Sequence, residues 1–168
     1  MKTLLPLVLL AAFLSTAALP ARAAQPDVMS VKQITLELAR DIAMASVDAC
    51  RQEGYNISAV VLDRAGNVQV AMRDTLAARH TLEIAERKAG MTIMSGIDSG
   101  EFRAARGDIR PELNHIDGLI VMEGGLPIRA AGSLIGAVGV SGAPGGDKDA
   151  ACASAALKKV EERLEFAM

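Results

Sequence analysis

The chain has 168 residues and a formal net charge of −2 at pH 7, from 18 basic and 20 acidic residues. No run of lysine and arginine stands out, and the chain has no tryptophan and one tyrosine. Nucleic-acid binding needs a basic patch and aromatic rings on which bases stack, so the sequence predicts no nucleic-acid partner.

The first 23 residues have the order of a secretory signal peptide. Lys2 gives a positive start, residues 4–14 form a short apolar run, and Ala21-Arg22-Ala23 offers small residues around a cleavable bond. A bilayer span needs roughly 20 apolar residues, which disfavours a membrane anchor. We therefore expect cleavage after Ala23, a single mature domain of residues 24–168, no membrane span in it, and a periplasmic or secreted location.

The mature chain loses two basic residues with the signal and keeps 16 basic and 20 acidic residues, a net charge of −4. Its aromatic residues are Tyr55, Phe102 and Phe166, so its core must be built from small aliphatic side chains. Such side chains bury little apolar area each, and burial stabilises a fold by only about 25 cal/mol per Å². Burial between subunits would add stability, and we expect a homo-oligomer of even order.

Apolar residues at helical spacing predict three long helices, over residues 31–53, 76–95 and about 147–165. Ser30 and Gln33 have the spacing of a capping box at the start of the first helix. A short helix is expected around 99–106, and residues 107–116 are expected to be an irregular connection.

Alternating and β-branched residues predict strands. Residues 57–62 and 68–72 flank the turn residues 63–67 and indicate a β-hairpin. Three further strand candidates are residues 119–122, 126–130 and 134–141. Because short connections favour antiparallel neighbours, we predict an α+β fold with an antiparallel sheet of about five strands flanked by helices.

The two cysteines, Cys50 and Cys152, form neither a C-x-x-C redox motif nor a zinc pattern. They are expected either as two buried thiols or as one disulfide. The sequence does not decide between these alternatives.

Candidate chemistry lies in the second predicted helix. His80, Glu83 and Glu86 follow one another at three-residue spacing, so neighbours share a face. The carboxylates of Glu83 and Glu86 are hard oxygen ligands for a cation, and an imidazole is a frequent metal ligand. The alternative is a solvated face on which Arg87 and Lys88 pair with the glutamates. No nucleophile or phosphate-loop motif is present, so the residues name no catalytic group.

Gly136 and Gly139 lie within an apolar strand candidate rather than between a strand and a helix. This position argues against a dinucleotide loop. Glycine inside a strand marks close approach by another backbone or by a ligand, here a flat apolar one.

Three motifs together resemble a known family: Gly124-Gly125-Leu126-Pro127-Ile128, the stretch 134–142, and Asp149-x-x-Cys152-Ala153. Upstream, Asp63-x-x-Gly66 and Ile84-Ala85-x-x-Lys88-Ala89 agree in order. On these residues the chain is similar to the GlcG/HbpS family of haem-binding proteins, also called haem-degrading or DUF336 proteins and related to the PduO C-terminal domain. The resemblance covers about residues 31–165.

The resemblance implies a profilin-like layered fold, dimers or higher oligomers, and haem as the ligand, with a corrinoid or an iron ion as alternatives. Together with the glycine and histidine positions above, it leads us to expect His80, Gly136 and Gly139 as the cofactor contacts, with His80 as the axial ligand. Met91, Met94, Met122 or Thr92 are the alternatives for that role. It also strengthens His80, Glu83 and Glu86 as metal ligands.

The expected function is an exported haem-binding protein that acts as a carrier, scavenger or sensor accessory. One rival is an enzyme that degrades haem or converts another small molecule in the same pocket. The other is a corrinoid-binding or cofactor-free oligomeric interaction protein. A non-enzymatic binding protein is favoured over the enzyme.

Overall fold

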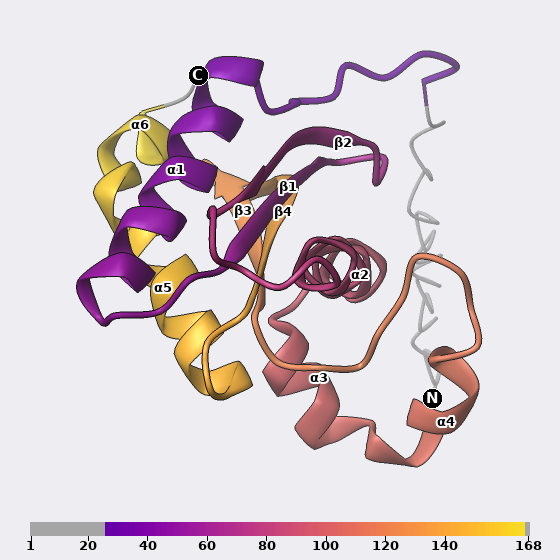
Figure 1. The fold of residues 1–168 in the computed structure, drawn as a ribbon. Coiled ribbons are helices and arrows are strands. Elements are labelled where there is room, and N and C mark those ends of the chain that lie inside the picture. Colours follow the sequence, from indigo (N-terminus) through magenta and orange to yellow (C-terminus); the bar gives the residue numbers. More distant parts are fainter. Residues whose placement is uncertain (1–25, 167–168) are drawn as a thin grey trace, which may run out of the picture. The chain divides into compact units, whose positions relative to one another are not determined.

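The computed structural model describes residues 26–166, and the compact unit of the chain begins at Val31. A single antiparallel sheet runs through this unit in the order β2-β1-β4-β3 (Figure 1). Its strands are β1 (Ser58–Asp63), β2 (Val68–Arg73), β3 (Gly125–Ala130) and β4 (Ser133–Ser141). The α+β class and the 57–72 hairpin are confirmed. The predicted signal peptide, residues 1–23, lies outside the described residues.

The sheet has four strands rather than about five, because the candidate at residues 119–122 was wrong. This segment satisfies its backbone locally: the Val121 amide donates to Asn114 Oδ1 at 2.9 Å, and the Met122 amide donates to Ile120 O at 3.0 Å. Val121 is fully buried, which explains the apolar sequence. A buried connection and a buried strand have similar apolar patterns.

The helices are α1 (Leu36–Gln52), α2 (Thr81–Ser95), α3 (Ser99–Ala105), the 3₁₀ turn η1 (Gly107–Ile109), α4 (Arg110–Leu113), α5 (Gly146–Lys159) and α6 (Glu161–Glu165). Helix α3 confirms the expected short helix. The predicted irregular connection contains η1 and α4, and the predicted last helix is divided at Val160 into α5 and α6.

Helices α1 and α2 each begin five residues later than predicted. The Ile34 amide donates to Ile135 O of β4 at 3.4 Å, which holds the chain before α1 in an extended form. Thr35, and not Ser30, is the N-cap, and its hydroxyl accepts from the Leu38 amide at 3.3 Å. Before α2, the Arg73 guanidinium donates to Ala77 O at 2.6 Å and stabilises a turn in place of a helical start.

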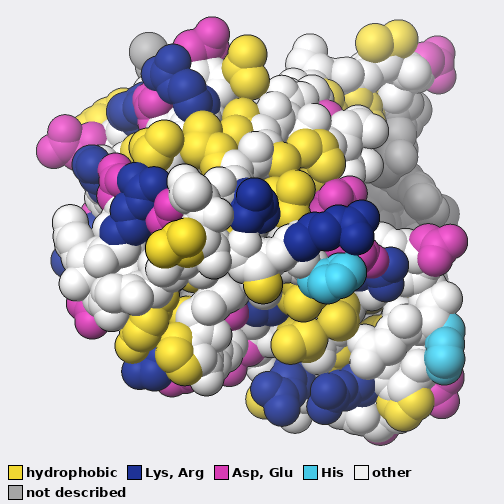
Figure 2. All heavy atoms as spheres, in the orientation of Figure 1, with side chains coloured by type: hydrophobic (Ala, Val, Ile, Leu, Met, Phe, Trp, Pro, Cys, Tyr) yellow, Lys and Arg dark blue, Asp and Glu magenta, His cyan; other side chains and the backbone are white. Residues whose placement is uncertain are grey.

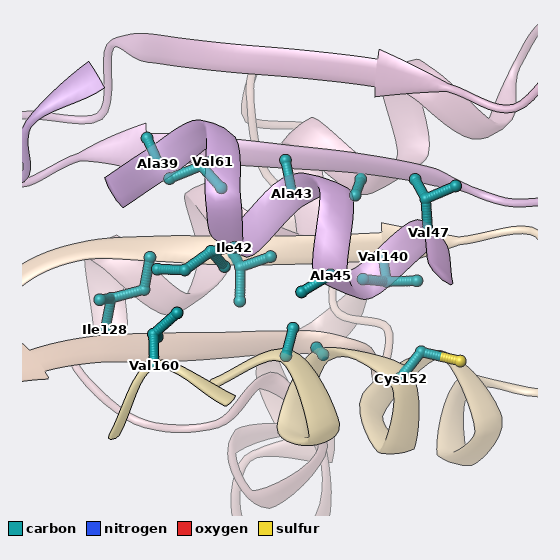
Figure 3. Packing of buried hydrophobic residues seen from close by; sticks show 14 of the residues in the cluster. Ala39, Ile42, Ala43, Ala45, Val47, Val61, Ile128, Val140, Cys152 and Val160 are labelled. Atoms are coloured by element: carbon teal, nitrogen blue, oxygen red, sulfur yellow. The ribbon is translucent and has the colours of Figure 1, made fainter. Parts of the chain in front are cut away.

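Helices cover both faces of the sheet: α1 and α5 pack on one face, and α2 packs on the other (Figure 1). The main core lies between the sheet and the α1–α5 layer, where small and β-branched side chains interlock (Figure 3). A smaller cluster under α2 contains Val60, Leu62, Ala85, Ala89 and Ala137. Alanine on the inner face of α2 lets this helix lie close to the strands.

Cys50 and Cys152 form a disulfide that joins α1 to α5, with 5.4 Å between their Cα atoms and a sequence separation of 102. The alternative of two buried thiols was therefore wrong. Cross-linking a loop of this length stabilises a fold by about 4–5 kcal/mol in the chain-entropy account.

Within residues 26–166, no helix combines the length and the apolar character that a membrane crossing requires.

Candidate functional site

Helix α2 presents its candidate ligands on the exposed face. His80 is the N-cap residue of α2, is exposed, and caps none of the helix amides with its ring. Both histidines of the chain lie at the surface, and one of them borders a hydrophobic patch (Figure 2). The His80 imidazole is therefore open to a ligand from outside the chain.

Glu83 and Glu86 are also exposed, but the three candidate ligands do not form one cluster. The Glu83 carboxylate forms an ion pair with Arg87, one turn later on the helix, with 2.7 Å between Oε1 and Nη2. Among the described residues, no group of three His, Cys, Asp or Glu side chains is placed to hold a metal ion. An ion at Glu83 and Glu86 would need water or another molecule to complete its coordination.

Gly139 lies directly under α2. A Cβ atom at this position would collide with the carbonyl oxygen of Ala85 and come within 2.9 Å of the Ala89 amide nitrogen. At Gly136, a Cβ atom would collide with Leu62 O and lie 3.4 Å from the Ile34 side chain. Within the described chain, protein atoms thus occupy the close-approach space at both glycines. Direct ligand contact at Gly136 and Gly139 stays a prediction that this packing does not support.

The buried face of α2 carries an ion pair that the sequence analysis did not identify as a functional feature. Lys88 Nζ lies 2.7 Å from Asp149 Oδ2, and the Lys88 and Asp149 side chains are 1% and 4% exposed. Lys88 also donates to Val140 O at 2.9 Å, and Asp149 Oδ1 accepts from the Ala143 amide at 3.0 Å. Burial raises the pKa of the Asp149 carboxyl, and the hydrogen bond from Lys88 opposes that rise.

The two glycines of the Gly124-Gly125 motif close around this pair. A Cβ atom at Gly124 would lie 2.9 Å from Lys88 Nζ, and φ at this residue is +118°. A Cβ atom at Gly125 would collide with Lys88 O and lie 2.7 Å from Thr92 Oγ1. At position 124, the positive φ and the space taken by the Lys88 ammonium both require a residue without a Cβ atom, which is glycine. The motif residues Lys88, Gly124, Gly125 and Asp149 thus pack together at one joint, the place where α2, β3 and α5 meet.

A signal for this joint was present in the sequence. Lys88 lies on the apolar face of the second predicted helix, three residues after Ala85 and four before Thr92. A lysine on an apolar face is rarely fully buried unless it is paired. No local pattern identifies Asp149 as its partner, because 61 residues separate the two.

Two hollows lie away from His80. One, of about 620 Å³, lies between β3 and the α5–α6 segment and is lined by Pro127, Leu157 and Leu164 among others. The other, of about 280 Å³, lies beside the disulfide and is lined by Tyr55, Lys148 and Cys152 among others. Neither is lined by any of the predicted site residues.

A family model described as "Haem degrading protein HbpS-like" matches residues 34–158. A crystal structure of HbpS is 34% identical, with a TM-score of 0.75, and the match covers 83% of this chain and 99% of that one. A Streptomyces reticuli HbpS variant, in which two glutamates three positions apart are aspartates, is 33% identical over 86% of this chain and 98% of that one, with a TM-score of 0.73.

A PduOC:haem complex shares the fold, with a TM-score of 0.66 and 21% identity over 75% of this chain and 94% of that one. The comparison with curated proteins finds no match.

Proposed function

Because the chain belongs to the HbpS-like family of haem-degrading proteins, we propose that it is an exported haem-binding protein that acts as a carrier, scavenger or sensor accessory. The observation that carries this proposal is the family match over residues 34–158, which includes α2 and both glycine motifs. The haem complex of a protein with the same fold also supports a tetrapyrrole ligand.

The chemistry of the exposed donors fits haem. Haem iron accepts an imidazole nitrogen as an axial ligand. His80 presents its ring at the start of a regular helix, and Leu76, four residues earlier, is 79% exposed. This side chain offers apolar surface to a porphyrin. The glutamate one turn later, Glu83, forms an ion pair with Arg87.

The other axial candidates differ in exposure. Met91 and Thr92 are fully buried, so neither reaches an external haem without rearrangement of α2. Met94 is 48% exposed and Met122 is 36% exposed, so both stay available, as does the exposed His115. His80 remains our preferred ligand because it lies at the start of a regular helix, whereas His115 lies in the connection after α4.

Two observations support export. Residues 1–23 have the pattern of a cleaved signal, and the chain forms the Cys50–Cys152 disulfide. Disulfides persist in the periplasm and outside the cell and are rare in the cytosol. Mass analysis of the protein recovered from the periplasm or the medium tests this, and we expect a chain that starts at Ala24.

Exposed apolar side chains support a homo-oligomer of even order. Large hydrophobic side chains exposed by 44–57% include Leu36, Met44 and Val68. Contact between copies would bury such surface. Sedimentation at micromolar concentration should give twice the chain mass or a higher even multiple, and a monomer alone would contradict this.

A second candidate function is oxidative degradation of haem, which the description of the family favours. A separate candidate is an iron ion held at Glu83 and Glu86, whose spacing equals that of the two glutamates replaced in the HbpS variant.

Haemin titration of the mature chain separates these functions. Haem binding predicts a saturable change of the Soret band that persists with reductant and oxygen. Loss of the band with formation of an open tetrapyrrole would identify the enzyme instead. No saturable change would contradict haem binding, and a parallel titration with a corrinoid would show whether that ligand takes its place.

A further inference from the structure

Two residues one turn apart in α5, Asp149 and Cys152, bind helices that lie on opposite faces of the sheet. Asp149 reaches around the end of the sheet to Lys88 of α2, with 2.7 Å between Oδ2 and Nζ. Cys152 is bonded to Cys50 of α1 on the other face of the sheet. Helix α5 therefore joins the layer on one face of the sheet to the helix on the other.

The Lys88 ammonium depends on this arrangement. Besides Asp149, the acceptor within hydrogen-bond distance of Nζ is Val140 O, at 2.9 Å, and the Lys88 residue is 1% exposed. A buried charge without its counter-ion is strongly unfavourable. If the first turn of α5 moved away, the ammonium would follow its partner or become accessible to water.

The N-terminus of α5 has no side-chain cap. Its N-cap residue is Gly145, and the segment before it contains Gly142 and Pro144. The inward side chains of α5 after Cys152 are small, namely Ala153 and Ala156. The ion pair of Asp149 and the disulfide of Cys152 are therefore the two strongest interactions that hold the first turns of α5.

One side of the disulfide borders a hollow, and Cys152 is 4% exposed. Cys152 lines the hollow of about 280 Å³ between the end of α1 and α5, with Tyr55 and Lys148 at its rim. Lys148 Nζ lies 5.8 Å from the centre of the Tyr55 ring, and Lys148 is exposed. Cys50 is fully buried and does not line the hollow.

We propose that the Cys50–Cys152 disulfide is a redox-sensitive latch whose reduction releases the first turns of α5 and exposes Lys88 while the rest of the domain stays folded. A dithiol reductant supplies the two electrons. One of its thiolates attacks Cys152 Sγ, the S–S bond breaks, and Cys50 leaves as a thiolate. The second thiolate of the reductant then releases Cys152 and forms a cyclic disulfide, and each cysteine ends as a protonated thiol.

Lysine reactivity tests the latch in the mature chain without any cofactor. Acetic anhydride is applied to the oxidised protein, to the protein reduced with dithiothreitol and then freed of reagent, and to the Cys50→Ala/Cys152→Ala variant. Mass spectrometry of peptides measures acetylation of Lys88, with Lys158, exposed at the far end of α5, as the internal control. We expect the rate at Lys88 to rise at least tenfold in both disulfide-free forms, and the rate at Lys158 to change less than twofold.

Amide hydrogen exchange in the same samples distinguishes local from global opening. The Ala143 amide, which donates to Asp149, should exchange at least tenfold faster after reduction, and the amides of β1 should keep their protection. A protected Lys88 in fully reduced protein would overturn the proposal. Equal acceleration at Ala143 and throughout β1 would also overturn it, because reduction would then unfold the domain as a whole.

Discussion

Lys88 of α2 and Asp149 of α5 form an ion pair with both side chains at least 96% buried, although they come from opposite faces of the sheet. Gly124 lies against the Lys88 ammonium, and the Ala143 amide satisfies the second oxygen of Asp149. The pair therefore fixes α2, which carries His80, to the end of the sheet.

Removing one partner of this pair should be costly. Asp149→Asn leaves the Lys88 ammonium buried without its counter-ion, and we expect the free energy of unfolding to fall by about 3–5 kcal/mol. Urea denaturation at pH 7 measures this. Asp147→Asn, at an exposed position in the same helical turn, is the matched control and should cost about 1 kcal/mol or less. Equal small losses in both variants would show that the pair does not stabilise the fold.

The contact of α2 with β4 leads to a second prediction. Gly139→Ala places a Cβ atom against the Ala85 carbonyl, so α2 must shift, and we expect a loss of about 1–3 kcal/mol. Gly107→Ala is the control, because no heavy atom lies within 4 Å of a Cβ atom there. Thermal and urea unfolding compare the two variants. A Gly139→Ala protein as stable as Gly107→Ala would disprove the close packing of α2 on β4.

A third prediction concerns acid. Arg51 donates to both oxygens of Asp74, at 2.7 and 2.9 Å, and these hydrogen bonds hold the pKa of Asp74 below its usual value of 3.8. A carboxyl with a lowered pKa in the folded state contributes stability above its ordinary pKa, and this contribution is lost as the pH falls through the folded value. The difference in unfolding free energy between wild type and Asp74→Asn should therefore be largest at neutral pH and shrink below about pH 4.

The control for acid unfolding is Asp117→Asn, at an exposed position, whose difference from wild type should be small. A difference for Asp74→Asn that stays constant from pH 7 to about pH 3 would contradict the role assigned to Arg51.

The fold was predictable where one pattern is enough to specify an element. The β1–β2 hairpin combines alternation with turn residues, and α3 follows the break at Gly96, so both were predicted from the sequence. The start of α1 was not, because the extended form of residues 31–34 depends on a bond to Ile135, about a hundred residues away. The segment 119–122 was mistaken for a strand because burial, and not pairing, explains its apolar residues.

The candidate site was predictable only in part. Spacing placed His80, Glu83 and Glu86 on α2, and all three are exposed there. The expected pairing of the glutamates with Arg87 and Lys88 is confirmed for Arg87, which binds Glu83 one turn away, and is wrong for Lys88, which is buried against Asp149. Spacing did not reveal the disulfide or the Lys88–Asp149 pair, because both join residues that are distant in sequence and meet only when the layers pack.

Haem bound through His80 is the central claim, and haemin titration of matched histidine variants tests it most directly. The mature chain, His80→Ala and His115→Ala are titrated under identical conditions, with Met94→Ala as a further variant. The account predicts saturable binding by the mature chain, an affinity at least tenfold lower and a shifted Soret maximum in His80→Ala, and unchanged spectra in His115→Ala and Met94→Ala. An unchanged Soret maximum and affinity in His80→Ala would remove His80 from the site, and the absence of saturable binding by the mature chain would contradict the account as a whole.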